Sequence, residues 1–141
     1  MKVIIIEDEK PAAEKLKKAI AKADDSIEVI ALLSSIQSAI TWFKNNTMPD
    51  LIFMDIELTD GLSFKIFEKI NISCPVIFCT AYDEYWQEAF EYNSIDYLLK
   101  PIRQDKLEAA LSKYEKLKKY FSQNLHTPVE VLFFYIKISF L

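Results

Sequence analysis

The chain alternates between short apolar runs and longer segments in which apolar residues recur every three or four positions. A short apolar run closed by a polar residue is typical of a buried strand, and the longer spacing is typical of an amphipathic helix. Strands are predicted at residues 3–6, 27–33, 51–54, 75–79 and 95–99. A helix is predicted after each strand. The helical patterns begin at or near Pro11, Ser35, Phe64, Asp83 and Leu107, and the last helix is expected to end at Phe121.

This alternation defines five strand–helix units within residues 1–121, and no internal repeat accompanies it. Strands that alternate with helices form parallel sheets, because each helix returns the chain to the same edge of the sheet. Several of the strands are apolar throughout, as burial on both faces of a sheet requires. We therefore expect an α/β fold with a doubly wound parallel sheet and helices on both faces.

Composition supports one packed domain and excludes several kinds of site. The chain is 51% apolar with a net charge of −4, which favours a core and gives no general attraction to nucleic acid or anionic membranes. Arg103 is the single arginine, so bidentate contacts to DNA bases, and a direct nucleic-acid partner, are not expected. The single glycine, Gly61, excludes the glycine-rich loops that bind dinucleotides or nucleotide phosphates.

Other features of the sequence predict a cytoplasmic setting. Acidic residues follow the apolar start too soon for a signal peptide, and the longest apolar run is far shorter than the ~20 residues of a membrane span. Cys74 precedes the predicted strand 75–79 and Cys79 ends it, so the extended strand holds the two thiols too far apart for a disulfide. We expect a reducing compartment and no membrane partner.

Polar side chains stand directly after four of the five predicted strands. Glu7 and Asp8 follow the first strand, Asp55 the third, Thr80 the fourth and Lys100 the fifth. The carboxyl ends of parallel strands meet at one edge of a sheet, where α/β proteins bind their ligands. Clustered carboxylates repel one another unless a cation lies among them, and oxygen ligands of this kind suit Mg²⁺. A carboxylate held by Mg²⁺ and lysine can act as a nucleophile toward phosphorus.

These residues and their neighbours resemble the receiver domain of two-component response regulators over residues 1–121. The segments 55–61 and 78–82 are similar to receivers of the LytR/AlgR type, whose output domain is a LytTR DNA-binding module. The resemblance implies a flavodoxin-like (βα)5 fold with strand order 2-1-3-4-5. It rests on Glu7-Asp8, Met54-Asp55-Ile56, Thr80-Ala81 and Asp96-Tyr97-Leu98-Leu99-Lys100-Pro101.

The resemblance implies that the chain is a phosphoacceptor that catalyses only its own phosphorylation and dephosphorylation. Asp55 would take a phosphoryl group from a phosphohistidine of a sensor histidine kinase. Thr80 and Lys100 would contact the phosphoryl oxygens, and Ala81 would keep the approach open. The peptide bond between Lys100 and Pro101 would be cis.

The resemblance also implies a metal site and a switch. Glu7, Asp8, Asp55 and the backbone carbonyl of Glu57 would hold Mg²⁺, and no organic cofactor is expected. Tyr97 would be an aromatic switch that swings inward when Thr80 moves. The face formed by the fourth helix, fifth strand and fifth helix would then change, which makes it a candidate surface for a homodimer or an output domain.

The loop after Asp55 departs from the family pattern. Thr59 stands where the family frequently has proline, and Ser63 where it frequently has glycine, while Gly61 comes two residues earlier. We expect these differences to alter the shape of the loop and the choice of partner. Glu57 places a carboxylate two residues from Asp55, and we hypothesise that it changes the lifetime of the acyl phosphate by affecting the attacking water.

Two alternatives belong to other functional classes. Residues 55–59 resemble the D-x-D-x-T motif of aspartyl-phosphatase-like hydrolases, but there the nucleophile follows the first strand and an acidic pair follows the lysine. The other alternative is a receiver-like interaction module that is never phosphorylated, which the complete set of acids, threonine and lysine disfavours.

The end of the chain differs in composition from the predicted receiver domain. Residues 122–128 are polar and resemble a linker, and residues 129–141 form an apolar, β-prone tail. The tail is too short for a domain, so it is either the truncated start of an output domain or a non-native segment.

Overall fold

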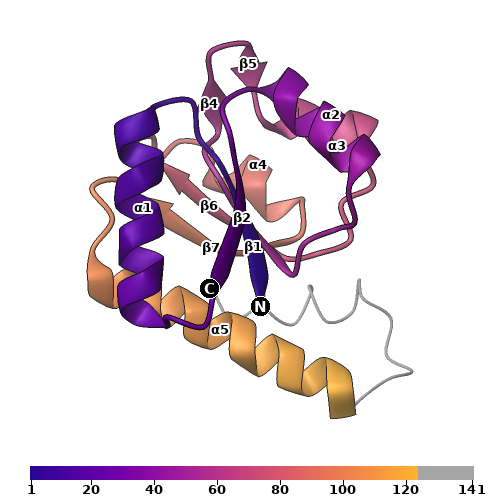
Figure 1. Cartoon of the computed structure of the whole chain (residues 1–141). Helices are drawn as coiled ribbons and strands as arrows, with labels where there is room; N and C mark the ends of the chain where they lie inside the picture. The colour runs from indigo at the N-terminus through magenta and orange to yellow at the C-terminus, as the bar shows by residue number, and fades with distance from the viewer. Residues whose placement is uncertain (124–141) are drawn as a thin grey trace.

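The computed structural model describes residues 1–123, which form one parallel sheet flanked by helices (Figure 1). Within this part of the chain the sheet has five strands in the order β2-β1-β3-β6-β7, and every neighbouring pair is parallel. This is the predicted 2-1-3-4-5 order, counted over the five strands of the main sheet. The strands are β1 (Lys2–Ile6), β2 (Glu28–Leu33), β3 (Leu51–Met54), β6 (Val76–Thr80) and β7 (Ser94–Leu99).

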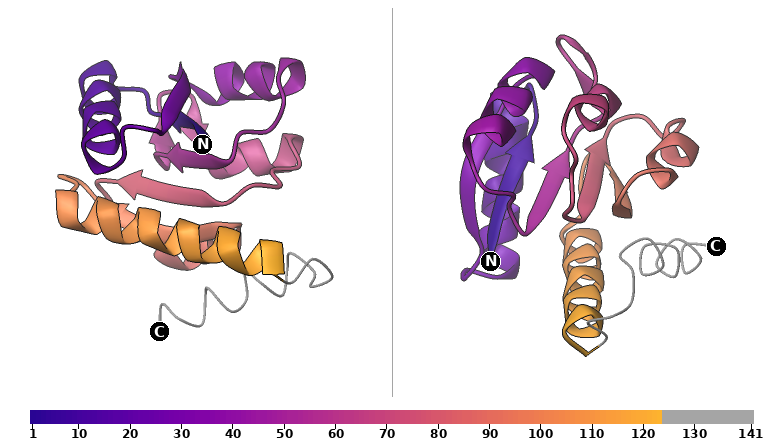
Figure 2. Two further views of the ribbon diagram at one scale, coloured as in Figure 1. Left: turned by 60° about the horizontal axis from the view of Figure 1, so that its bottom comes forward. Right: turned by 90° about the vertical axis from the view of Figure 1, so that its right-hand side faces the viewer.

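Helices cover both faces of the sheet, as Figures 1 and 2 show. Side chains of α1 and α5 pack on one face against β-strand residues such as Ile5 and Phe53. Side chains of α2, α3 and α4 pack on the other face, where the core is richer in aromatic rings. The helices are α1 (Lys10–Ala23), α2 (Ile36–Asn45), α3 (Phe64–Lys69), α4 (Trp86–Phe90) and α5 (Gln104–Gln123).

The predicted start of α2 is confirmed in detail. The hydroxyl of Ser35 accepts a hydrogen bond from the backbone N–H of Ser38, while the Ser38 hydroxyl accepts one from the N–H of Ser35. Such reciprocal capping satisfies backbone donors that have no partner within the helix. Trp42, on the same helix, packs edge-on against Phe43 at a centroid distance of 5.4 Å.

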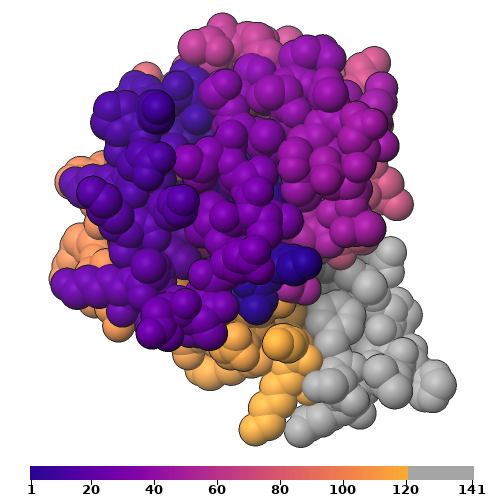
Figure 3. All heavy atoms as spheres, viewed as in Figure 1, coloured from indigo at the N-terminus to yellow at the C-terminus, as the bar shows by residue number. Residues whose placement is uncertain are grey.

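The structure adds a hairpin to the predicted elements and changes the bounds of two helices by more than the strand ends shift. A two-residue hairpin, β4 (Glu57–Leu58) with β5 (Gly61–Leu62), follows β3 and stands at the top of the molecule in Figures 1 and 3. It was not predicted, because strands of two residues are too short to show a period. Helix α4 is shorter than predicted, since residues 83–85 form bends and turns, and α5 ends at Gln123 instead of Phe121.

Residues 1–123 also test several smaller predictions. The peptide bond between Lys100 and Pro101 is cis. Cys74 and Cys79 are both buried free thiols. No helix in the described residues combines the length and the apolar character that a membrane span needs. The predicted tail and most of the predicted linker lie outside the described residues.

Candidate functional site

The carboxyl ends of the strands bring the predicted acidic residues together. One carboxylate oxygen from each of Glu7, Asp8 and Asp55 lies within 4.8 Å of the others. Glu7 and Asp55 are buried, and Asp8 is half-buried. The cluster therefore opens to solvent on the Asp8 side, which suits a metal ion that keeps some of its water ligands.

Backbone hydrogen bonds beyond the strand ends hold these residues in place. The N–H of Asp55 donates to the carbonyl of Ile6 at 2.8 Å, and the N–H of Glu7 donates to the carbonyl of Leu33 at 2.8 Å. On the other side of β3, the N–H of Lys100 donates to the carbonyl of Thr80 at 2.8 Å. The sheet itself thus positions each side chain, because its hydrogen bonds continue one residue past the apolar runs.

Lys100 is the cation of the cluster. Its Nζ donates to the carboxylate of Glu7 and to Oδ2 of Asp55, the latter at 2.9 Å. Burial acts to lower the pKa of Lys100, but the hydrogen bonds to Glu7 and Asp55 outweigh it and raise that pKa above its usual value. Lys100 is therefore a permanent positive charge against the side chain of Asp55.

The carboxyl group of Glu7 has a strongly raised pKa. Burial raises its pKa from 4.5 to about 7, and the hydrogen bond from Lys100 only partly opposes that rise. Hydrogen bonding to Asp8 and the charge of Asp55 add to the rise. A divalent cation among these carboxylates would favour their charged forms.

The donor set fits Mg²⁺. Glu7, Asp8 and Asp55 supply only oxygen ligands, and Mg²⁺ in proteins is commonly held by one or two carboxylates, waters and phosphate oxygens. Glu57 lies on β4, immediately beyond the cluster in the chain. The role of its carbonyl as a ligand stays a prediction.

The side chains of Thr80 and Tyr97 make no hydrogen bond to the three carboxylates within residues 1–123. Thr80 ends β6 and is fully buried, and its Oγ1 accepts a long hydrogen bond, 3.4 Å, from the N–H of Tyr82. The hydroxyl of Tyr97 donates to the carbonyl of Tyr82. Burial raises the pKa of Tyr97 to about 12, so its hydroxyl keeps its proton at neutral pH. Both side chains thus have a hydrogen bond with the backbone of Tyr82.

Tyr82 is the residue of this site that the sequence analysis missed. Its backbone contacts both Thr80 and Tyr97, so it links two predicted switch residues. The nearby carboxylate of Glu57 raises the pKa of the Tyr82 phenol, so the two side chains lie close together. The only sign of this role in the sequence is that Tyr82 stands two residues after Thr80. Hydrophobic periodicity cannot identify such a residue, because it lies in a loop.

Comparison of the sequence with models of protein families identifies the family of this chain. The model of the response regulator receiver domain matches residues 3–112. The chain belongs to this family. It is therefore a receiver domain of two-component response regulators, as the resemblance in the sequence indicated. The acidic cluster, the buried threonine and the lysine remain the predicted site of that domain.

Relatives of this receiver domain include LytR/AlgR-type proteins. The chain is 33% identical to the sensory transduction protein LytT of Bacillus anthracis, across 84% of the chain and 48% of that protein. It is 34% identical to a positive alginate biosynthesis regulatory protein of Pseudomonas aeruginosa, across 80% of the chain and 46% of that protein. The chain spans about half the length of these curated relatives.

Solved structures support the fold of the receiver domain. The response regulatory domain of protein mrkE from Klebsiella pneumoniae superposes with a TM-score of 0.73 and 28% identity, covering 87% of this chain and 99% of that one. The response regulator PhyR from Brucella abortus superposes with a TM-score of 0.75 at 23% identity, covering 89% of this chain and 51% of that one.

Proposed function

We propose that Asp55 accepts a phosphoryl group from the phosphohistidine of a sensor histidine kinase, with Mg²⁺ held by Glu7, Asp8, Asp55 and the carbonyl of Glu57. The observation that carries this proposal is the contact of Lys100 Nζ with Asp55 inside a cluster of three carboxylates. Mg²⁺ would neutralise charge on the acids and on the phosphoryl oxygens.

The transfer would use Asp55 as the nucleophile and Lys100, Thr80 and Mg²⁺ as the groups that bind the phosphoryl oxygens. A carboxylate oxygen of Asp55 attacks phosphorus, a P–O bond forms, and the P–N bond to the kinase histidine breaks. The electron pair of that bond stays on the imidazole nitrogen. Lys100 and the hydroxyl of Thr80 would donate to phosphoryl oxygens. The Thr80 oxygen accepts from the N–H of Tyr82, which leaves the proton of the hydroxyl available for this bond.

The experiment is incubation with acetyl phosphate, or with beryllofluoride, in the presence of Mg²⁺. We expect a mass increase with acetyl phosphate and shifted amide resonances with beryllofluoride, and both are lost in Asp55→Ala. Asp50→Ala is the matched control, because Asp50 stands at the opposite end of β3 and its carboxylate accepts from the N–H of Lys2 at 2.7 Å. A wild-type protein that shows no change would favour the interaction module that is never phosphorylated.

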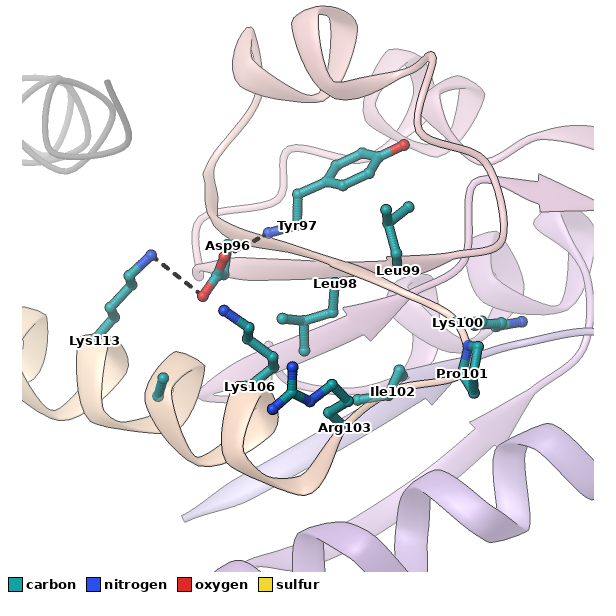
Figure 4. Close-up of a pocket in the computed structure, with 11 residues that line it drawn as sticks. Asp96, Tyr97, Leu98, Leu99, Lys100, Pro101, Ile102, Arg103, Lys106 and Lys113 are labelled. Carbon is teal, nitrogen blue, oxygen red and sulfur yellow. Dashed lines mark hydrogen bonds and ion pairs between the residues drawn. The ribbon is translucent and has the colours of Figure 1, made fainter.

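We further propose that phosphorylation changes the surface formed by α4, β7 and α5. A cavity of about 510 Å³ lies there between β7 and α5, and Figure 4 shows Lys106 and Lys113 reaching into it from α5. Lys113 pairs with Asp96 at 3.3 Å. The α4 region across β7 is acidic, with Asp83, Glu84, Glu88 and Glu91.

These opposite charges favour a symmetric homodimer in which α4 of one copy faces α5 of the other. We expect sedimentation velocity to show a larger fraction of dimer with beryllofluoride than without it. Raising the salt concentration should reduce that fraction, because exposed charges are screened. A sedimentation coefficient that beryllofluoride leaves unchanged would exclude this part of the proposal.

The size of the relatives supports a longer protein. We propose that residues 1–121 are the receiver domain, that residues 122–128 are a linker, and that a LytTR-type DNA-binding domain is the output. The cytoplasm is the proposed compartment, which the two free, buried cysteines suit. Sequencing the reading frame beyond residue 141 tests the architecture, since a LytTR-like segment there would complete a transcription factor.

Glu57 is proposed to set the lifetime of the acyl phosphate. Its carboxylate lies near the phenol of Tyr82, so the pair would stand at the approach of the attacking water. We expect Glu57→Gln to change the rate of dephosphorylation severalfold, measured from the decay of radiolabelled protein. An unchanged rate in Glu57→Gln and in Glu57→Ala would remove Glu57 from the mechanism.

A further inference from the structure

The turn of the β4–β5 hairpin is bonded to the start of α2, which lies more than twenty residues earlier in the chain. Oδ1 of Asp60 accepts from the N–H of Ile36 at 2.9 Å, and Oδ2 accepts from the N–H of Gln37 at 3.1 Å. These are first-turn amides of α2, which have no partner inside the helix. Asp60 therefore joins the loop that follows Asp55 to a helix that takes no part in the acidic cluster.

Asp60 is well suited to this contact in its charged form. Partial burial acts to raise its pKa, but the hydrogen bonds from Ile36 and Gln37 outweigh burial and hold that pKa below its usual range. A negative charge at a helix N-terminus is also favoured by the helix dipole. The contact is therefore present at neutral pH.

Gly61 allows the hairpin to approach α2. Its φ is +134°, a conformation that residues with a side chain rarely adopt. A Cβ at this position would also lie 3.3 Å from Cδ1 of Ile36. The shift of glycine to position 61, seen as a departure from the family pattern, is thus explained by the seating of the hairpin on α2.

The hairpin is held at both ends. At its base, the N–H of Ser63 donates to the carbonyl of the fully buried Ile56 at 2.8 Å. At its tip, Asp60 is bonded to α2. Glu57 lies between these attachments, paired with Leu62 across the hairpin. Asp60 is therefore one of the attachments that hold the hairpin on which Glu57 lies.

We propose that Asp60 is a positioning residue: by bonding the β4–β5 hairpin to the first turn of α2, it places the backbone carbonyl of Glu57 for binding a divalent cation. This inference rests on the proposed function, because the carbonyl matters only where Mg²⁺ is bound. Asp60 itself contacts no ligand of the cluster. It acts as outer-shell residues do, by orienting the group that binds the metal.

The experiment measures Mg²⁺ affinity by calorimetric titration, together with amide hydrogen exchange at Ile36 and Gln37. In Asp60→Ala both acceptors are lost, and we expect Mg²⁺ affinity to fall by about tenfold, the lower end of the effect of outer-shell changes. Asp60→Asn keeps one carbonyl oxygen and should lie between wild type and Asp60→Ala. Exchange at Ile36 and Gln37 should become faster in the same order.

Asp24→Ala is the matched control. Oδ1 of Asp24 also accepts from a backbone N–H in a turn, that of Ser26 at 3.0 Å, and the pKa of Asp24 is also lowered, chiefly by that serine. We expect this variant to keep wild-type Mg²⁺ affinity. If Asp60→Ala does not fold, Asp60→Asn still tests the proposal.

The outcomes separate this inference from the proposed function. If wild type binds Mg²⁺ and the Asp60 variants bind it equally well, the inference is overturned and the proposed function stands. A drop in thermal stability without a drop in affinity would show that Asp60 only supports the fold. If wild type binds no Mg²⁺, both proposals fall.

Discussion

The two halves of the site are organised differently. The acidic half consists of Glu7, Asp8, Asp55 and Lys100, and the aromatic half consists of Thr80, Tyr82, Tyr85, Trp86 and Tyr97. In the acidic half, one lysine bonds two buried carboxylates, and each residue follows a strand of the sheet. In the aromatic half, Tyr82 is 44% exposed, Trp86 is 51% exposed, and the hydroxyl of Thr80 has a single long contact within the described residues.

This difference suggests that phosphoryl transfer and the proposed change of the surface depend on different parts of the site. The acids and the lysine that we propose for phosphoryl transfer are already held together, so this half of the site requires little rearrangement. The aromatic side chains proposed to carry the response are partly or largely exposed, and regions of low local stability open most easily. A change in the acidic half should therefore affect stability and metal binding most, and a change in the aromatic half should affect them least.

The largest effect is expected for Lys100→Met. Glu7 and Asp55 would lose their cation, and the free energy of unfolding should fall by about 3 kcal/mol in buffer without Mg²⁺, as when a buried ion pair is broken. Urea denaturation measures this value, with Lys106→Met, an exposed lysine of α5, as the control. Equal loss in the two variants would mean that the acidic half is not organised by Lys100.

Mg²⁺ should stabilise the protein by a comparable amount. A ligand present at a hundred times its Kd adds about 2.7 kcal/mol to the free energy of unfolding. We expect thermal unfolding to shift upward with Mg²⁺ in wild type and to lose most of that shift in Asp8→Asn. An undiminished shift in the variant would place the ion elsewhere.

The pH dependence should identify Glu7. Its pKa is about 7 in the folded protein and 4.5 as its usual value, so the folded state binds the proton more tightly. Without Mg²⁺, this contribution to stability is complete below pH 4.5 and is lost as the pH rises to 7. Asp24 and Asp60, whose pKa values are lowered, act below that window. Urea denaturation between pH 5 and pH 8 should show a decline in wild type that is flatter in Glu7→Gln.

Ser63→Ala should stabilise the protein. Ser63 is fully buried, and its Oγ has no hydrogen-bond partner among the described residues. Removing an unsatisfied hydroxyl is expected to add about 1 kcal/mol to the free energy of unfolding. Ser63→Cys tests the reason, since it keeps a side chain of similar shape with a much weaker need for a partner. A loss of stability in Ser63→Ala would show that the hydroxyl has a partner.

Tyr97→Phe should have the smallest effect on stability. It removes a hydrogen bond from a partly exposed hydroxyl to the carbonyl of Tyr82, which is worth about 0.5 kcal/mol. Mg²⁺ affinity should stay at the wild-type value, while the change in dimer fraction with beryllofluoride should be smaller. A large loss of Mg²⁺ affinity would contradict the separation of the two halves.

The grouping of the acidic half was predictable from the sequence, whereas the contacts within the aromatic half were not. Apolar runs closed by Glu7, Asp55 and Lys100 identify strand ends, and parallel strands must bring those ends to one edge. The contact of Asp60 with Ile36 depends instead on tertiary packing between distant segments, which no local pattern encodes. The same holds for the link from Tyr82 to Tyr97, because a loop carbonyl is available as an acceptor in any sequence.

The fluorescence of the two tryptophans can report on two different regions of the molecule. Trp42 is on α2, the helix to which the hairpin is bonded, and Trp86 is on α4, beside the aromatic half. Trp86 is half exposed, so its emission and its quenching by iodide should follow movements of α4. Trp42 is less exposed and packs against Phe43, so its emission should follow α2. Variants in which one tryptophan is replaced with phenylalanine would each keep a single fluorescent reporter. Stopped-flow fluorescence of the two variants would then measure the rate of metal binding and the rate of the later surface change separately.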